Sequence, residues 1–317
     1  MTAMGRVARD LRIPVSRNWG LGLALATAVI SGVAVWLNSY AVKQVPDPAV
    51  YTTLKNAVAA AVLIGLLATA GGGTQVRRLD RGQWMRLAII GMIGGSIPFL
   101  LFFGGLAQAT APGAAFIHKT LFVWVALLAV PLLGERLGMI QVAAMATLLL
   151  GQLFIAPPNV QGAGWGTGET MIAVATLLWS VEVILAKRLL DSVPSSAVGA
   201  ARLAIGVVFL VGYLAVTGGL GAVASVTTTG WAWILVTGLV LAAYVGTWFA
   251  ALSRAPASAV TSVLVVGAVI TAILQALSTG TVPSTGVALG GTLIAATTAV
   301  VVLLAVRRRG DRLGLPG

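Results

Sequence analysis

Ten runs of apolar residues, separated by short connections, restrict what this 317-residue chain can fold into. Each run is long enough to cross a lipid bilayer as a helix, which takes about 20 residues. The connections are rich in turn-forming residues, and none is long enough to hold a soluble domain. The predicted spans are 19–41, 49–70, 84–106, 112–133, 138–156, 168–188, 196–217, 230–252, 256–278 and 285–306.

The composition excludes a water-soluble fold. Only 9% of the residues are charged and 58% are hydrophobic, whereas an ordinary soluble domain carries about 25% charged residues. Lipid is therefore the expected solvent, and the chain is predicted to be an all-α integral membrane protein. The net charge of +12 does not indicate a nucleic-acid partner, because the basic residues lie in short clusters between apolar runs.

The distribution of Lys and Arg predicts how the spans are oriented. Alternate connections and the two ends of the chain hold sixteen of these residues, whereas the opposite connections hold only Lys43. Loops on the cytoplasmic side carry the excess of positive charge. Residues 1–18 and the basic tail 307–317 are therefore predicted to be cytoplasmic, in the plasma membrane of a bacterial-type cell. The first apolar run is too long for a signal peptide and is expected to be retained.

The sequence repeats itself weakly at a shift of 144 residues. Residues 111–115 (APGAA) align with residues 255–259 (APASA), and Lys43 aligns with Lys187. Each copy holds five spans, an odd number, so the second copy must cross the membrane in the opposite orientation. The predicted fold is thus ten transmembrane helices in a 5+5 inverted-topology repeat, with one copy in the first half and one in the second. Such repeats enclose a midplane site that is exposed to each side in turn, which favours a transporter. The two copies are predicted to cover 19–156 and 168–306.

Short motifs in the two copies carry a family resemblance. Residues 131–136 (PLLGER) are followed by Gln141 and Gly151, and a stretch from tryptophan to lysine occurs at 36–43 and again at 179–187. Together with the ten spans, this pattern resembles the EamA type of the drug/metabolite transporter superfamily. The resemblance implies a secondary transporter for a small metabolite, such as an amino acid or another carboxylate-bearing molecule, with export favoured over import.

Two other function classes stay open from the sequence alone. One is an intramembrane enzyme acting on a lipid phosphate, and the other is a non-transporting membrane scaffold. The enzyme would need a nucleophile beside a base, paired carboxylates or metal ligands. The chain has one histidine, no cysteine and a single acidic residue deep in a span, so we expect no enzymatic activity, no cofactor and no metal. The expected partners are a small-molecule substrate and the lipid bilayer, without nucleic acid, and the chain is expected to be a monomer or a homodimer.

Ionisable residues inside spans are costly, by about 2.5–3.5 kcal/mol each on insertion scales, and are therefore candidates for function. Glu182 and Arg202 lie at matched depth on consecutive antiparallel spans, which predicts a structural ion pair. Glu182 is equally a candidate for substrate binding. Asn38 and Lys55 are the counterparts of this pair in the first copy. Asn38 is a candidate for substrate binding, and Lys55 is expected to extend to the nearby membrane interface.

His118 and Lys119 form a polar pair in the fourth predicted span. Lys119 lies seven residues inside the span, which is about 10 Å below the outer surface. No deep acidic residue is available in that half of the bundle to neutralise it. We expect Lys119 to bind an anionic group of the substrate and His118, whose unperturbed pKa is near 6.5, to tune that binding. The alternative is that Lys119 extends to the interface and that His118 makes a structural hydrogen bond.

Polar and aromatic residues on the spans that line the cavity in the resembling family complete the predicted substrate site. Tryptophans near span ends are commonly interface anchors, and deeper ones line pockets or pack against neighbouring helices. Small-residue patterns such as Gly91-xxx-Gly95 are expected to let helices pack closely inside the bundle. The further candidates for substrate binding are Trp36, Trp179, Tyr244, Trp248 and Ser262.

Overall fold

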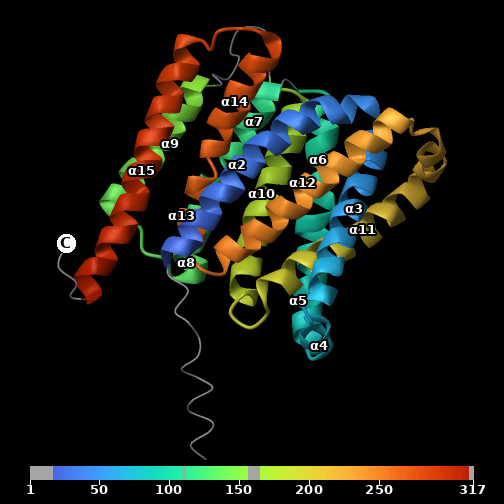
Figure 1. Cartoon of the computed structure of the whole chain (residues 1–317), viewed down its shortest axis with the longest axis horizontal. Coiled ribbons are helices and arrows are strands. Elements are labelled where there is room, and N and C mark those ends of the chain that lie inside the picture. Colours follow the sequence, from blue (N-terminus) through green and yellow to red (C-terminus); the bar gives the residue numbers. More distant parts are fainter. Residues whose placement is uncertain (1–16, 110, 156–164, 314–317) are drawn as a thin grey trace, which may run out of the picture.

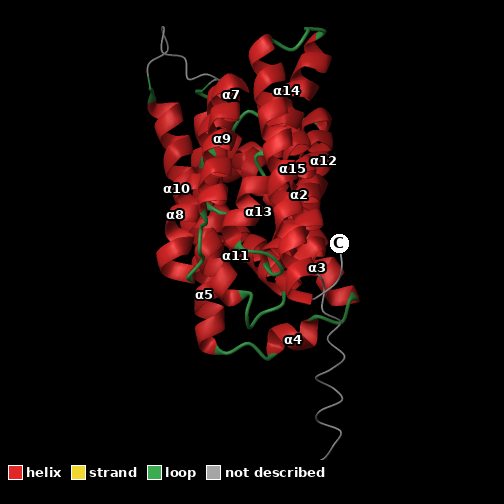
Figure 2. Ribbon diagram, turned by 90° about the vertical axis from the view of Figure 1, so that its left-hand side faces the viewer, coloured by secondary structure: helices red, strands yellow, loops and turns green. Residues whose placement is uncertain are grey.

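The structure is a computed structural model that describes residues 17–109, 111–155 and 165–313. Every regular element in these ranges is helical, and the long helices run side by side as a bundle (Figures 1 and 2). The helices of the first half are α2 (Arg17–Ala41), η1 (Val42–Gln44), α3 (Pro48–Thr69), α4 (Gly73–Arg77), α5 (Arg81–Gly95), α6 (Ile97–Leu106), α7 (Ala111–Lys119), α8 (Leu121–Leu133) and α9 (Met139–Ile155). Those of the second half are α10 (Thr167–Leu189), α11 (Ser195–Thr217), η2 (Gly219–Ser225), α12 (Thr228–Leu252), α13 (Ala257–Val263), α14 (Val266–Thr279) and α15 (Thr285–Leu313).

The outer surface of the bundle is apolar. Leu127 is 60% exposed, Val208 71% and Leu277 73%, and many other large aliphatic side chains face outward. Soluble monomers expose only small contiguous patches of this kind, so a lipid environment accounts for the surface. The polar residues Thr176, Ser180 and Glu182 are buried within the bundle instead. The chain is therefore a multi-pass membrane protein.

Nine helical stretches in the described ranges are long and apolar enough to cross a membrane, and Met139–Ile155 is a shorter apolar helix of 17 residues. These stretches coincide with the predicted spans. The last helix differs, because α15 continues to Leu313 and takes in residues predicted as a tail. The described ends of the chain, in α2 and α15, lie at the same end of the bundle (Figure 1). Residues 1–16, predicted to be cytoplasmic, lie outside the described ranges.

Three predicted spans are interrupted helices. The third span breaks at Ser96, where φ is −133° and ψ is −74°. The fourth breaks at Thr120, between α7 and α8, and the ninth between Val263 and Val266. Residues 120 and 264 correspond at the repeat shift of 144, so the fourth span of each copy breaks at the same place. Backbone groups freed at membrane depth are tolerated where protein surrounds them.

The helix contacts are symmetric: when each helix is replaced by its counterpart in the other copy, the main contacts stay the same. Helix α3 packs against α11 and α9 against α15, and in each case the two partners occupy the same place in their copies. Helix α2 packs against α12 and α14, whereas its counterpart α10 packs against α6 and α8. The contact of α3 with α12 is matched by that of α11 with α5. This pattern is the one that two copies related by a two-fold axis produce.

Glycines allow the closest helix crossings. A Cβ on Gly206 would lie 2.5 Å from the carbonyl oxygen of Gly95, and one on Gly32 would lie 2.6 Å from that of Gly267. Such distances exclude any larger residue without movement of the backbone. The Gly91-xxx-Gly95 pattern faces α11 in this way, so it serves packing inside the bundle as expected.

Candidate substrate cavity

A cavity of about 110 Å³ lies at the centre of the bundle. Both halves of the chain line it, with α2, α3, α6, α7 and α8 from the first and α10, α11 and α12 from the second. Its wall combines charged, amide and aromatic side chains with aliphatic ones. A concave, mostly apolar site with a few polar groups is the usual form of a small-molecule site.

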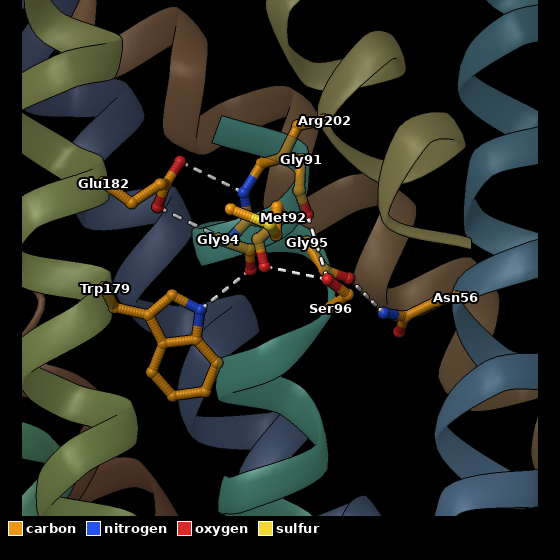
Figure 3. Close-up of polar contacts among 9 residues, drawn as sticks. All are labelled: Asn56, Gly91, Met92, Gly94, Gly95, Ser96, Trp179, Glu182 and Arg202. Carbon is orange, nitrogen blue, oxygen red and sulfur yellow. Dashed lines mark hydrogen bonds and ion pairs between the residues drawn. The ribbon is translucent and has the colours of Figure 1, made fainter. Parts of the chain in front are cut away.

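An ion pair lies in the wall of this cavity. Arg202 Nε donates to Glu182 Oε1 at 3.1 Å, and Arg202 Nη2 lies 3.5 Å from Oε2. Both side chains are buried, with exposures of 6% for Arg202 and 2% for Glu182. Gly94 allows the approach, because a Cβ there would lie 2.4 Å from Cγ of Glu182 (Figure 3). The pair links α10 to α11 beside α5, on the two helices from which the sequence analysis expected it.

The break at Ser96 supplies acceptors to the same region. In a continuous helix the N–H of residue 98 would bond to the carbonyl of Gly94, but Pro98 has no N–H. Instead, the indole Nε1 of Trp179 donates a hydrogen bond to the Gly94 carbonyl at 3.0 Å, and Asn56 Nδ2 donates one to the Gly95 carbonyl at 3.2 Å (Figure 3). These bonds satisfy buried groups that would otherwise be costly. They also fix the ring of Trp179 at the cavity wall.

Lys55 lies in a second polar group of the wall. It is 2% exposed, and its Nζ donates to Asn38 Oδ1 at 3.1 Å. The Tyr51 hydroxyl lies 2.5 Å from the same oxygen and 3.0 Å from Thr237 Oγ1, so three helices meet in this group. Lys55 Nζ also lies 3.7 Å from the ring centre of Phe103, a cation–π contact. The expectation that Lys55 extends to the membrane interface was therefore wrong.

Aromatic rings form most of the remaining wall. Phe102 contacts Phe103 and Trp179 with ring centres 5.2 and 5.6 Å apart, and Tyr244 stacks on Trp248 at 6.1 Å. His118 packs between Phe102 and Trp179, at 5.2 and 5.0 Å. Among the described residues, its buried Nδ1 has no hydrogen-bond partner. The imidazole thus contacts two aromatic rings of the wall.

Six of the nine residues predicted to bind substrate line the cavity, and three do not. Those in the wall are Asn38, His118, Trp179, Glu182, Tyr244 and Trp248. Trp36 is turned toward α14, where its Nε1 donates to Ser278 Oγ at 3.3 Å. Ser262 Oγ donates to the carbonyl of Ser258 one turn earlier.

Lys119 lies behind the wall instead of in it. Its Nζ donates to Ser31 Oγ at 3.0 Å, and a Cβ on Gly267 would lie 3.2 Å from it. Ser31 itself lines the cavity, so Lys119 is one residue removed from it. The side chain is 3% exposed and does not extend to the interface either. His118 therefore lines the cavity and Lys119 does not, since about 100° of helix separates the two side chains.

The phenylalanines of α6 line the cavity but were not among the predicted site residues. Phe99, Phe102 and Phe103 recur at the i, i+3, i+4 spacing of one helix face, directly after the break at Ser96. In a chain rich in apolar residues this spacing does not stand out. The neighbouring Gly94, Gly95 and Pro98 were the available signal for a broken helix with a specialised face.

The two ends of the bundle differ in how the halves contact each other. At the end that holds the α8–α9 connection, Glu135 Oε1 accepts from the Ala257 N–H at 2.6 Å, and its other oxygen accepts from Ser258. Arg188 Nη2 donates to the Leu132 carbonyl at 2.5 Å. At the opposite end a depression is lined by Lys43, Pro46 and Ala109, among others.

Leu106 lines both that depression and the central cavity. The cavity therefore borders the end of the bundle opposite Glu135. Charged contacts join the halves at the Glu135 end. The described part of the chain is thus closed at one end by hydrogen bonds that charged side chains make with the opposite half, and hollowed at the other end.

The comparisons with known proteins agree with this architecture. A solved structure described only as "Crystal structure of protein" superposes with a TM-score of 0.73 at 20% identity, covering 92% of this chain and 99% of that one, which shows the fold alone. No curated protein matches the chain. The sequence profile of the EamA-like transporter family, however, matches residues 18–156 and again residues 166–303, the two halves that enclose the cavity. By this double match over most of its length, the chain belongs to the EamA-like transporter family, within the drug/metabolite transporter superfamily.

Proposed function

We propose that this protein is a secondary transporter that moves a small metabolite across the plasma membrane by alternating access. The central cavity between the two repeats of a transporter-family chain carries the proposal. The substrate is an amino acid or another small molecule bearing a carboxylate, and export is its direction. The proposed substrate contacts are the six predicted residues of the wall: Asn38, His118, Trp179, Glu182, Tyr244 and Trp248.

Flux through reconstituted protein tests this function. Ala34 lines the cavity, so Ala34→Trp fills it, whereas Ala143 is exposed on the outer surface and Ala143→Trp is the matched control. The protein and both variants are placed in liposomes loaded with a panel of amino acids and carboxylates. We expect at least one compound to exchange through the parent protein and the Ala143→Trp variant. Ala34→Trp is expected to reduce that exchange by at least about ten-fold, because the indole occupies space that the substrate needs. A ten-fold loss of binding corresponds to about 1.4 kcal/mol.

The competing function classes give different results in the same experiment. Equal flux through the Ala34→Trp variant would show that the cavity is not the route. Hydrolysis of lipid phosphates without any flux would favour an enzyme instead. Neither alternative has support from the family, whose members are transporters.

The proposed topology has ten spans in a 5+5 inverted repeat, with both termini in the cytoplasm. The short helix α9 counts as a span, because 17 residues reach about 25 Å and lie at the lower limit of membrane-crossing helices. The symmetric pattern of helix contacts between the two halves supports the inversion. The excess of Lys and Arg at one end supports the orientation.

Reporter fusions test the orientation. We expect a reporter that is active only in the cytoplasm to work when joined after residue 317 or inserted within 77–86 or 187–194, because these segments hold the positive charge. A reporter that requires export is expected to work when inserted beside Lys43. Activity of the exported reporter at the C-terminus would contradict the proposed topology.

A further inference from the structure

The charges that face the cavity do not cancel. Glu182 and Arg202 pair with each other, which leaves Lys55 as the remaining charged side chain of the wall. Among the described residues, no carboxylate oxygen lies within 4.0 Å of Lys55 Nζ. A buried cation without a counter-ion is rare in a membrane protein and commonly marks a functional site.

The contacts of Lys55 leave room for a ligand. An ammonium group has three donors, and in the described structure Lys55 Nζ uses one, toward Asn38 Oδ1. Its other close neighbours are the ring faces of Phe103, Phe99 and Tyr51. Aromatic faces stabilise a cation without accepting a conventional hydrogen bond. Donors therefore remain for an anion that enters the cavity.

The ammonium group is also held in place before any ligand arrives. Asn38 is anchored by its own Nδ2, which donates to the Ala34 carbonyl at 2.6 Å. Its Oδ1 lies 2.5 Å from the Tyr51 hydroxyl and accepts from Lys55. A site fixed by such surrounding bonds loses little freedom on binding.

The rest of the wall selects the remainder of the ligand. Phe99, Phe102, Trp179, Tyr244 and Trp248 present ring surface that suits an aromatic or branched aliphatic body. A ligand ammonium group would find no free carboxylate, because both oxygens of Glu182 face Arg202. The wall thus offers a cation and apolar surface, without a second anchor of opposite sign.

We propose that Lys55 binds the carboxylate of a monoanionic substrate whose body is aromatic or branched aliphatic. This inference rests on the proposed transport function and narrows its substrate class from carboxylate-bearing metabolites in general. It also excludes amino acids, because the carboxylate of the wall that could neutralise their ammonium group, Glu182, is already paired with Arg202.

Four probes of similar size and different charge test the substrate class. These are 3-phenylpropanoate, L-phenylalanine, 2-phenylethylamine and 3-phenylpropan-1-ol. Binding to the full chain in lipid nanodiscs is followed by tryptophan fluorescence, because Trp179 and Trp248 line the cavity. We expect 3-phenylpropanoate to bind at least about ten-fold more tightly than each of the others, since it alone brings a negative charge to the ammonium group without burying a positive charge of its own. Equal or tighter binding of the amine or the amino acid, or no binding of any probe, would overturn the proposal.

Two variants test the role of Lys55. Lys55→Met removes the charge at similar length, and Asn38→Asp places a carboxylate against the ammonium group in nearly the same shape. Each is expected to weaken binding of 3-phenylpropanoate by about 10- to 100-fold. Lys119→Met is the matched control, because Lys119 is equally buried but lies behind the wall, and it is expected to change binding by less than about two-fold. Unchanged binding in Asn38→Asp, which retains every helix contact of Lys55, would overturn the assignment even if Lys55→Met does not fold.

Flux measurements separate this proposal from the transport function. Binding of 3-phenylpropanoate that depends on Lys55, without flux in liposomes, would contradict transport and support the site. Flux of amino acids that is insensitive to Lys55→Met would support transport and contradict the site. Flux of 3-phenylpropanoate that is lost in Lys55→Met and kept in Lys119→Met supports both.

Discussion

Replacing Arg202 with methionine is expected to lower the free energy of unfolding by about 3–5 kcal/mol, because it leaves the Glu182 carboxylate buried and unpaired. Methionine keeps most of the aliphatic length, so the loss reflects the charge rather than a cavity. The measurement is equilibrium unfolding of the purified protein in mixed detergent micelles. Arg254→Met is the control, because Arg254 donates to Ala250 and Ser253 and leaves no carboxylate behind.

The double variant shows whether the two residues act together. Glu182→Gln alone leaves the Arg202 guanidinium without its counter-ion, and the combined variant removes both charges. The combined loss is expected to be smaller than the sum of the single losses by about 0.5–3 kcal/mol, the usual range for side chains in contact. Strictly additive losses would show that the pair contributes nothing beyond its two separate environments.

This pair was predictable from the sequence because depth along a helix is fixed by residue number. Glu182 lies near the end of its span and Arg202 near the start of the next, so a short connection sets them at the same level. Their contact needed only that each side chain point inward, which the cost of a charge facing lipid ensures. The same reasoning located Asn38 and Lys55 at one level, where they form a hydrogen bond.

The position of Lys55 in the cavity wall was not predictable, because depth does not reveal the helix face. Each residue turns the helix by 100°, and in α3 apolar residues occur all around, so no stripe marks the inward side. Lys119 is the opposite case: it was expected in the cavity, but its side chain lies behind the wall and donates to Ser31. Which of two buried lysines faces the cavity is decided by packing between distant spans.

The helix breaks also differ in how far the sequence reveals them. The break at Ser96 has a local cause, because Pro98 removes a backbone donor and two glycines precede it. The break after Val263 has no proline at it, and it matches the break at Thr120 through the repeat. The two copies therefore share this break. The apolar runs of the sequence predicted where the long helical stretches lie but not their internal interruptions.

Replacing Glu135 with glutamine is expected to open the cavity toward the end of the bundle where Glu135 joins the two halves. One carboxylate oxygen accepts from the Ala257 N–H at 2.6 Å, and the other accepts from the Ser258 N–H and hydroxyl. These bonds join the end of α8 to the start of α13, and hence the first half of the chain to the second. Hydrogen bonds to a charged acceptor contribute about 1.5–3 kcal/mol each, roughly twice as much as neutral ones. Glutamine keeps the shape and one acceptor oxygen but loses the charge, so the closed arrangement becomes less populated.

The chain offers a direct measurement, because its sequence contains no cysteine. A single Ala34→Cys substitution places one thiol in the cavity wall, and a membrane-impermeant thiol reagent is applied to vesicles of either orientation. A loss of 1.4 kcal/mol from the closed arrangement increases the open fraction about ten-fold. The labelling rate from the Glu135 end is therefore expected to increase at least about ten-fold in Glu135→Gln. Arg136→Gln is the control, because the neighbouring side chain is exposed, and its labelling rate should equal that of the parent. If Glu135→Gln slows flux while labelling from this end stays unchanged, Glu135 does not hold that end closed, and its bonds to α13 serve the stability of the fold alone.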